Sequence, residues 1–152
     1  MIEGRIEISF RGFKGNAENQ NWGESFMDKI ILPKFKFDEN VFKEIGKVIK
    51  DKQEKNLYYG YDIRGGMVKP KKQPSKYGGW RIFLNRGILF DSIEMESSIN
   101  RARVFISANR SQIAYWLCTG TKKMVARPFF GLNRELKEDI LKILKRQIYG
   151  NN

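Results

Sequence analysis

The chain has 152 residues, with 29 Lys or Arg, 17 Asp or Glu and no His, which gives a net charge of +12 at pH 7. This length and a hydrophobic content of 41% indicate a single folded domain over residues 1–152. Because there is no His and only one Cys, the composition excludes Ser-His-Asp and Cys-His hydrolases, zinc sites that need His or several Cys, and an intrachain disulfide.

The excess of basic residues predicts attraction to polyanions such as nucleic acid, although a solvated basic surface has the same composition. No apolar run approaches the roughly 20 residues that a membrane-spanning helix needs, so we expect no membrane partner.

The N-terminal part predicts two strands. Residues 6–10 alternate between apolar and polar side chains, which is typical of a half-buried strand. Residues 2–5 spell a protease recognition sequence of the kind left by a purification tag, so this interpretation gives them little weight. Residues 30–32 predict a short strand that ends at Pro33.

Residues 38–55 predict the first helix. Asp38 is a plausible N-cap, and acidic side chains come early and lysines late, as the helix dipole favours. Gly46 lies on or beside the apolar face, where it could let another backbone come close. The predicted buried face consists of Val41, Phe42, Ile45, Val48 and Ile49.

Residues 56–79 predict a long irregular loop or extended arm, which is the best candidate for a segment that reaches a partner. The stretch over residues 69–81 interleaves basic residues with Tyr77 and Trp80, and such a pattern can neutralise phosphates and stack on bases. A solvated basic loop remains the alternative. Together with a later basic loop, it supplies the candidate DNA-facing residues Lys69, Lys71, Lys72, Lys76, Lys122 and Lys123.

Residues 93–97 and 102–108 alternate on either side of a short polar turn and predict an antiparallel hairpin. Glu94 or Glu96 would then face Arg101 or Arg103 across the strands. Together with Asp91, the two glutamates resemble the acidic part of a metal-dependent nuclease. No lysine follows them as such a site requires, so we expect no metal site here.

Residues 111–120 predict a short helix with Ser111 as its cap and Gly120 at its end. Cys118 is expected to be a buried structural thiol, because no His is present to activate it. The predicted buried residues of this helix are Ile113, Ala114, Trp116 and Leu117.

The segment "RPFFGL" over residues 127–132 precedes the last helix. Pro128 favours an extended backbone at Arg127. Phe129 and Phe130 should then point to opposite sides, so that one ring enters the core and the other faces a partner. Asn133 caps a final helix whose buried face carries Leu136, Ile140, Ile143 and Leu144. The element order predicts an α+β domain with a small antiparallel sheet packed against two main helices and a long irregular loop.

Three pieces occur in order: "RGILFDSI" over residues 86–93, "IAYWLCTG" over 113–120, and "MVARPFFGL" over 124–132 before an acid-rich helix. Between residues 80 and 143 they resemble the phage virion morphogenesis family, the tail completion proteins of long-tailed phages. Many members have His or Gln before the glycine of the second piece, where Cys118 and Thr119 stand here.

The resemblance implies a non-enzymatic structural protein that joins heads to tails or terminates tails as a homo-oligomeric ring. It implies no cofactor, a location in the virion after assembly in the host cytoplasm, and phage neck or tail-tube proteins as partners, with DNA passing through the ring. A sequence-nonspecific nucleic-acid-binding domain is the alternative function. The candidate interface residues are Tyr58, Tyr59, Tyr61, Arg127, Phe129 and Phe130.

Overall fold

The computed structural model describes residues 2–14, 22–59, 61, 63, 92–106, 108–120, 122 and 128–150. The elements confirm the predicted α+β class. In chain order they are β1 (Ile2–Lys14), β2 (Trp22–Phe35), α1 (Val41–Tyr59), β3 (Ile93–Ser97), β4 (Arg101–Ile106), α3 (Ala108–Thr119) and α4 (Arg134–Tyr149).

The four strands form one sheet in the order β2-β1-β4-β3. The β1–β2 and β3–β4 pairs are antiparallel, and the second of these confirms the predicted hairpin. The central pair, β1 with β4, is parallel, so the prediction of a wholly antiparallel sheet is wrong at this junction. A parallel pair needs a long crossover connection, and the segment containing α1 supplies it.

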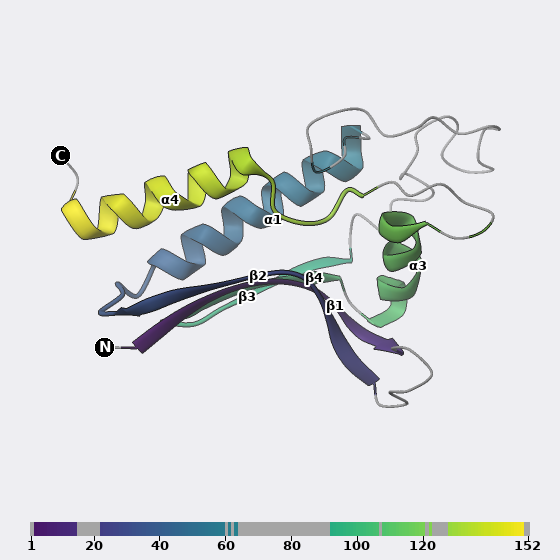
Figure 1. Ribbon diagram of the computed structural model, residues 1–152, viewed down its shortest axis with the longest axis horizontal. Helices are drawn as coiled ribbons and strands as arrows, with labels where there is room; N and C mark the ends of the chain where they lie inside the picture. Colours follow the sequence, from purple (N-terminus) through teal and green to yellow (C-terminus); the bar gives the residue numbers. More distant parts are fainter. Residues whose placement is uncertain are drawn as a thin grey trace.

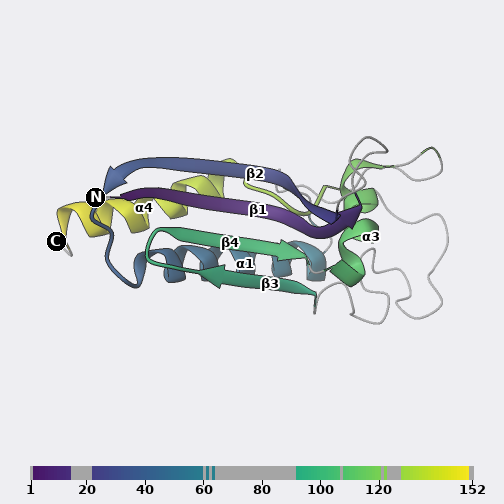
Figure 2. The ribbon, with the colours of Figure 1, turned by 90° about the horizontal axis from the view of Figure 1, so that it is seen from below.

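Both main helices cover the same face of the sheet. Figure 1 shows α1 and α4 side by side above the strands, with α3 at the end where β1 and β2 bend away. Seen from below in Figure 2, the strands lie in front of the helices, and none of the described helices covers that face. The core between the layers contains Ile6, Ile8, Phe10, Phe42, Ile45, Ile49, Ala102, Val104, Ile106, Leu136, Ile140 and Ile143.

Several element boundaries differ from the predictions, among them the start of α3, which is at Ala108 and not after a cap at Ser111. Helix α1 starts at Val41 and continues to Tyr59, so residues 56–59 are helical rather than part of a loop. The helix continues because Asn56 and Leu57 are buried against the core. Strand β2 is much longer than residues 30–32 and contains Pro33. This proline lies where the β1–β2 register shifts between Leu32 and Phe35, and such irregularities in an edge strand tolerate proline.

Residues 2–5, to which the sequence pattern gave little weight, are part of β1. Gly4 pairs with Leu32 in the β1–β2 ladder, and the Arg5 N–H donates to the Asn100 carbonyl at 2.8 Å. The low weight given to these residues is therefore wrong.

Two glycines make room for side chains. A Cβ on Gly4 would lie 2.8 Å from Cζ of Phe42 and 3.0 Å from Cζ of Phe37. A Cβ on Gly46 would lie 2.7 Å from the Met95 sulfur, so the close neighbour expected at Gly46 is a side chain and not another backbone. The two sites differ because packed rings resist displacement, whereas a thioether adapts.

We expect Gly4→Ala to lower the free energy of unfolding by about 1–3 kcal/mol through overpacking. Gly46→Ala should lower the free energy of unfolding by less, because Met95 can move and alanine stabilises the helix by about 1 kcal/mol relative to glycine. Urea denaturation of both variants measures the difference. A Gly46→Ala loss as large as that of Gly4→Ala would contradict this account of the packing.

Candidate functional site

Phe129 and Phe130 are both 0% exposed, so the prediction that one of the two rings faces a partner is wrong. Their ring centroids are 6.0 Å apart, and the Phe130 ring lies 5.2 Å from that of Phe10 on β1. The segment runs between α1 and α3, as Figure 1 shows, so both directions available to an extended segment lead into the interior. These residues build the fold and offer no surface to a partner.

Two side-chain amides on α1 hold the backbone of this segment. Gln53 donates through Nε2 to the Gly131 carbonyl at 2.8 Å and accepts from the Gly131 N–H at 3.0 Å. Asn56 donates through Nδ2 to the Phe129 carbonyl at 3.0 Å. The spacing of three residues places both amides on one face of α1, and both are buried. We call Gln53, Asn56 and the backbone of residues 129 and 131 the amide clip.

The clip satisfies buried backbone groups that have no neighbouring strand to pair with, and an unpaired group there would cost about 1–3 kcal/mol. Gln53 and Asn56 are not among the site residues predicted from the sequence. The available signal was that Gln53 continues the stripe of Ile45 and Ile49 at a spacing of four residues. A polar side chain in an apolar stripe needs an internal partner.

Further hydrogen bonds join the segment to other elements. The Ile63 N–H donates to the Pro128 carbonyl at 2.8 Å, and the Leu132 N–H donates to Oδ2 of Asp28 on β2 at 2.8 Å. Gly131 has a φ of +150°, which favours glycine, and a Cβ there would lie 3.1 Å from the Asp28 carboxylate. Asn133 Oδ1 accepts from the Leu136 N–H at 2.7 Å, which confirms the predicted N-cap of α4.

Cys118 packs against the same segment. Burial raises the pKa of its thiol from 9.0 to about 11, although hydrogen bonds with the backbone of Phe129 and Phe130 act in the opposite direction. The prediction of a buried thiol is confirmed, and its protonated form predominates at neutral pH. The predicted burial of Ile113 and Trp116 is wrong, because α3 turns its Ala114 and Cys118 side inward and leaves these two side chains exposed.

Three tyrosines form an exposed group at the C-terminal end of α1, and we call them the tyrosine cluster. Tyr58, Tyr59 and Tyr61 are 45%, 56% and 37% exposed. The ring centroids of Tyr58 and Tyr59 are 4.9 Å apart in an edge-to-face arrangement, and those of Tyr59 and Tyr61 are 5.9 Å apart. The Tyr61 N–H donates to the Asn56 carbonyl at 3.0 Å, so a clip residue also positions the cluster.

The open face of the sheet carries a row of alternating charges. The strand register aligns Lys29, Glu7, Arg103 and Glu96 across all four strands. Glu7 is 2% exposed, with Arg103 Nε at 3.1 Å and Arg101 Nη2 at 3.5 Å from its two oxygens. The 3.1 Å contact between Arg103 and Glu7 is an ion pair, but its geometry is not that of a hydrogen bond. The predicted pairing of Glu96 with Arg103 is confirmed at 4.0 Å, whereas Glu94 lies opposite Phe105.

Several predicted site residues fall outside the part of the chain that the structure describes. Asp91, named with Glu94 and Glu96 as an acidic group, also falls outside it. Of the candidate DNA-facing lysines, Lys122 is described, and it is exposed. The remaining predicted site residues outside the described ranges are Lys69, Lys71, Lys72, Lys76, Lys123 and Arg127.

Within the described ranges, no group of three or more Asp, Glu or Cys side chains is placed to hold a metal ion. No helix in these ranges is long and apolar enough to cross a bilayer. Comparison of the chain with protein-family models, with curated proteins and with solved structures finds no match.

Gln53→Ala should lower the free energy of unfolding by about 2–4 kcal/mol, because it leaves the buried N–H and carbonyl of Gly131 without partners. Gln147 is a matched control, since its amide donates to the Lys36 carbonyl at 3.1 Å in an exposed position. Gln147→Ala should change the free energy by less than about 0.5 kcal/mol. Similar losses of unfolding free energy for the two variants in urea denaturation would show that the buried amide of Gln53 stabilises the fold no more than an exposed amide does.

Cys118 should make stability fall at alkaline pH. Above pH 9.0 the unfolded thiol releases its proton, whereas the folded thiol keeps it until a pH of about 11. The unfolded state then binds fewer protons, so the free energy of unfolding decreases as pH rises. The loss by pH 11 is on the order of 2–3 kcal/mol for this shift. The Cys118→Ala variant should not show this alkaline loss of stability. If the free energy of unfolding of the two proteins fell in parallel between pH 9 and pH 11, the prediction would be wrong.

Proposed function

We propose that this protein is a non-enzymatic structural subunit that associates head to tail with copies of itself into a closed ring. The observation that carries the proposal is the tyrosine cluster. It exposes three aromatic rings together, and Tyr is among the residues most enriched at protein interfaces and their energetic hot spots.

The way the cluster is held supports this role. Tyr58 and Tyr59 follow directly after Asn56 and Leu57, which are buried, and Tyr61 is tied back to Asn56. A tyrosine fixed in this way loses little conformational freedom when a partner binds, so less of the contact energy is lost to ordering.

A closed ring needs two different patches on each subunit, because its contacts are heterologous. The second candidate patch is a stripe that runs from the middle of α4 to its C-terminal end, where residues at spacings of seven and eight share a side of the helix. The stripe consists of the exposed residues Leu141, Ile148 and Tyr149. It lies at the opposite end of the molecule from the tyrosine cluster (Figure 1), which suits a head-to-tail contact.

The proposal extends to the place of the ring. The order of "IAYWLCTG" and "MVARPFFGL" before an acid-rich helix resembles tail completion proteins of long-tailed phages. A ring at the phage neck or tail end, in contact with neck or tail-tube proteins and around the path of the DNA, is therefore the proposed setting. The net charge of +12 suits contact with phosphates along that path, and it also supports the second candidate, a sequence-nonspecific nucleic-acid-binding domain.

Two variants test the head-to-tail contact. Tyr58→Ala/Tyr59→Ala removes most of one patch, and Leu141→Ala/Ile148→Ala removes most of the other. Each variant alone should be monomeric in light scattering after size-exclusion chromatography. An equal mixture should form dimers and nothing larger, because only one intact interface remains between the two variants.

Ile31→Ala is the control, because it removes an exposed apolar side chain of similar size on β2 and should leave the wild-type assembly unchanged. A wild-type protein that stays monomeric at every concentration would contradict self-association. Steep salt-dependent DNA binding by that monomer would instead favour the second candidate.

A further inference from the structure

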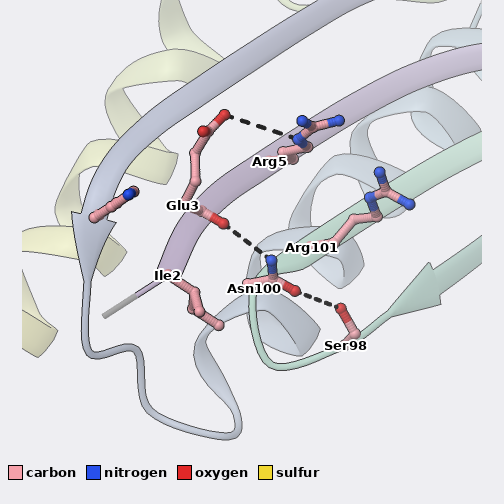
Figure 3. A pocket seen from close by; sticks show the side chains of 7 residues that line it. Ile2, Glu3, Arg5, Ser98, Asn100 and Arg101 are labelled. Carbon is pink, nitrogen blue, oxygen red and sulfur yellow. Dashed lines mark hydrogen bonds and ion pairs between the residues drawn. The ribbon is translucent and has the colours of Figure 1, made fainter.

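The open face of the sheet is hollowed at the end where β3 turns into β4. The pocket there has a volume of about 680 Å³ and takes its walls from β1, β2 and the β3–β4 turn, as Figure 3 shows. An adjoining hollow of about 200 Å³ shares Ser98 and Arg101 with it and is also lined by Arg103 and Glu96. The described residues that line the larger pocket are Ile2, Glu3, Arg5, Lys34, Ser98, Asn100 and Arg101.

The lining carries three cations against one carboxylate. Arg5 and Arg101 are direct neighbours in the parallel register of β1 and β4, where like charges repel each other. Figure 3 shows their guanidinium groups on adjacent strands. The repulsion between the two side chains is unfavourable for the fold, and a bound anion would reduce it.

The carboxylates nearby compensate this charge only in part. Arg5 contacts Glu3 through Nε at 3.8 Å, and Arg101 contacts Glu7 through Nη2 at 3.5 Å. Each arginine therefore forms an ion pair with one carboxylate in the described ranges. Lys34 has no such pair with any residue in the described ranges.

The pocket wall is built without a ligand. Asn100 donates through Nδ2 to the Glu3 backbone carbonyl at 3.0 Å. The backbone carbonyl of Asn100 accepts from the Arg5 N–H at 2.8 Å. Ser98 donates to Oδ1 of Asn100 at 3.2 Å, which fixes the turn further. Since these bonds hold the turn against β1, the two arginines are positioned before any anion arrives, and little ordering is needed on binding.

The shape and chemistry point to phosphate. Guanidinium groups are planar forks that match phosphate oxygens in pairs, and an ammonium group adds a third positive charge. The volume exceeds that of one phosphate group, so adjacent phosphates can enter together. None of the seven described lining residues is aromatic, so the pocket offers no platform on which a base could stack.

We infer that this pocket binds a run of phosphate groups, either pyrophosphate-like or a nucleic-acid backbone, and does so without reading base identity. The inference is independent of self-association. It also assigns the phosphate contacts to residues of β1, β2 and the β3–β4 turn, which are not among the lysines that the sequence pattern had suggested.

Calorimetric titration of the full chain at low ionic strength tests the pocket with two probes, inorganic pyrophosphate and short DNA duplexes of two different sequences. Arg5→Gln and Lys34→Gln should each weaken pyrophosphate binding by about tenfold, as expected for the loss of one charge-assisted contact. Both variants keep Arg101 and Arg103 beside Glu7, and equal melting temperatures in phosphate-free buffer would verify their folding.

Lys137→Gln is the matched control, since it removes the same charge from an exposed position on α4 and should change affinity by less than about twofold. Pyrophosphate binding without DNA binding would support the pocket and assign it a free phosphate ligand. Binding of both probes, with equal affinity for the two duplex sequences, would support it and assign the backbone. No binding of either probe, or equal weakening by Lys137→Gln, would overturn the inference.

Discussion

The amide clip is the constraint on which the arrangement of this protein depends. Gln53 and Asn56 bind the backbone of a segment more than 70 positions away along the chain, at contacts of 2.8–3.0 Å in the interior. The same segment donates a hydrogen bond to the Asp28 carboxylate on β2 and is followed directly by the N-cap residue of α4. One short stretch thereby fixes the two main helices and the edge of the sheet relative to one another.

The clip also determines which surfaces remain for partners. Because it draws Phe129 and Phe130 into the core, these two rings are not available to a partner, whereas the tyrosines that follow Asn56 are exposed. At the other end of the sheet, Glu7 lies between arginines and compensates only part of their charge. The molecule therefore has an aromatic patch at one end and a basic hollow at the other. The two suit different ligands, namely a protein surface and a chain of phosphates.

The sequence predicts features that depend on neighbouring residues. Alternation predicts the inward face of β1 and the β3–β4 hairpin, and Asn133 predicts the start of α4. The predictions that prove wrong concern contacts between segments that are distant along the chain. The parallel pairing of β1 with β4 joins residues almost 100 positions apart, and local periodicity carries no information about it. Burial of both phenylalanines depends on α1 and α3 enclosing them from two sides, and the alternation rule assumes one open side.

Amide hydrogen exchange, followed residue by residue, tests most directly whether the segment before α4 is a fixed internal element. If the clip holds it, the amides of Gly131 and Leu132 exchange as slowly as those in the middle of α1 and become accessible only when the whole domain unfolds. Exchange of these two amides at the rate of an unprotected chain, while α1 stays protected, would contradict the account.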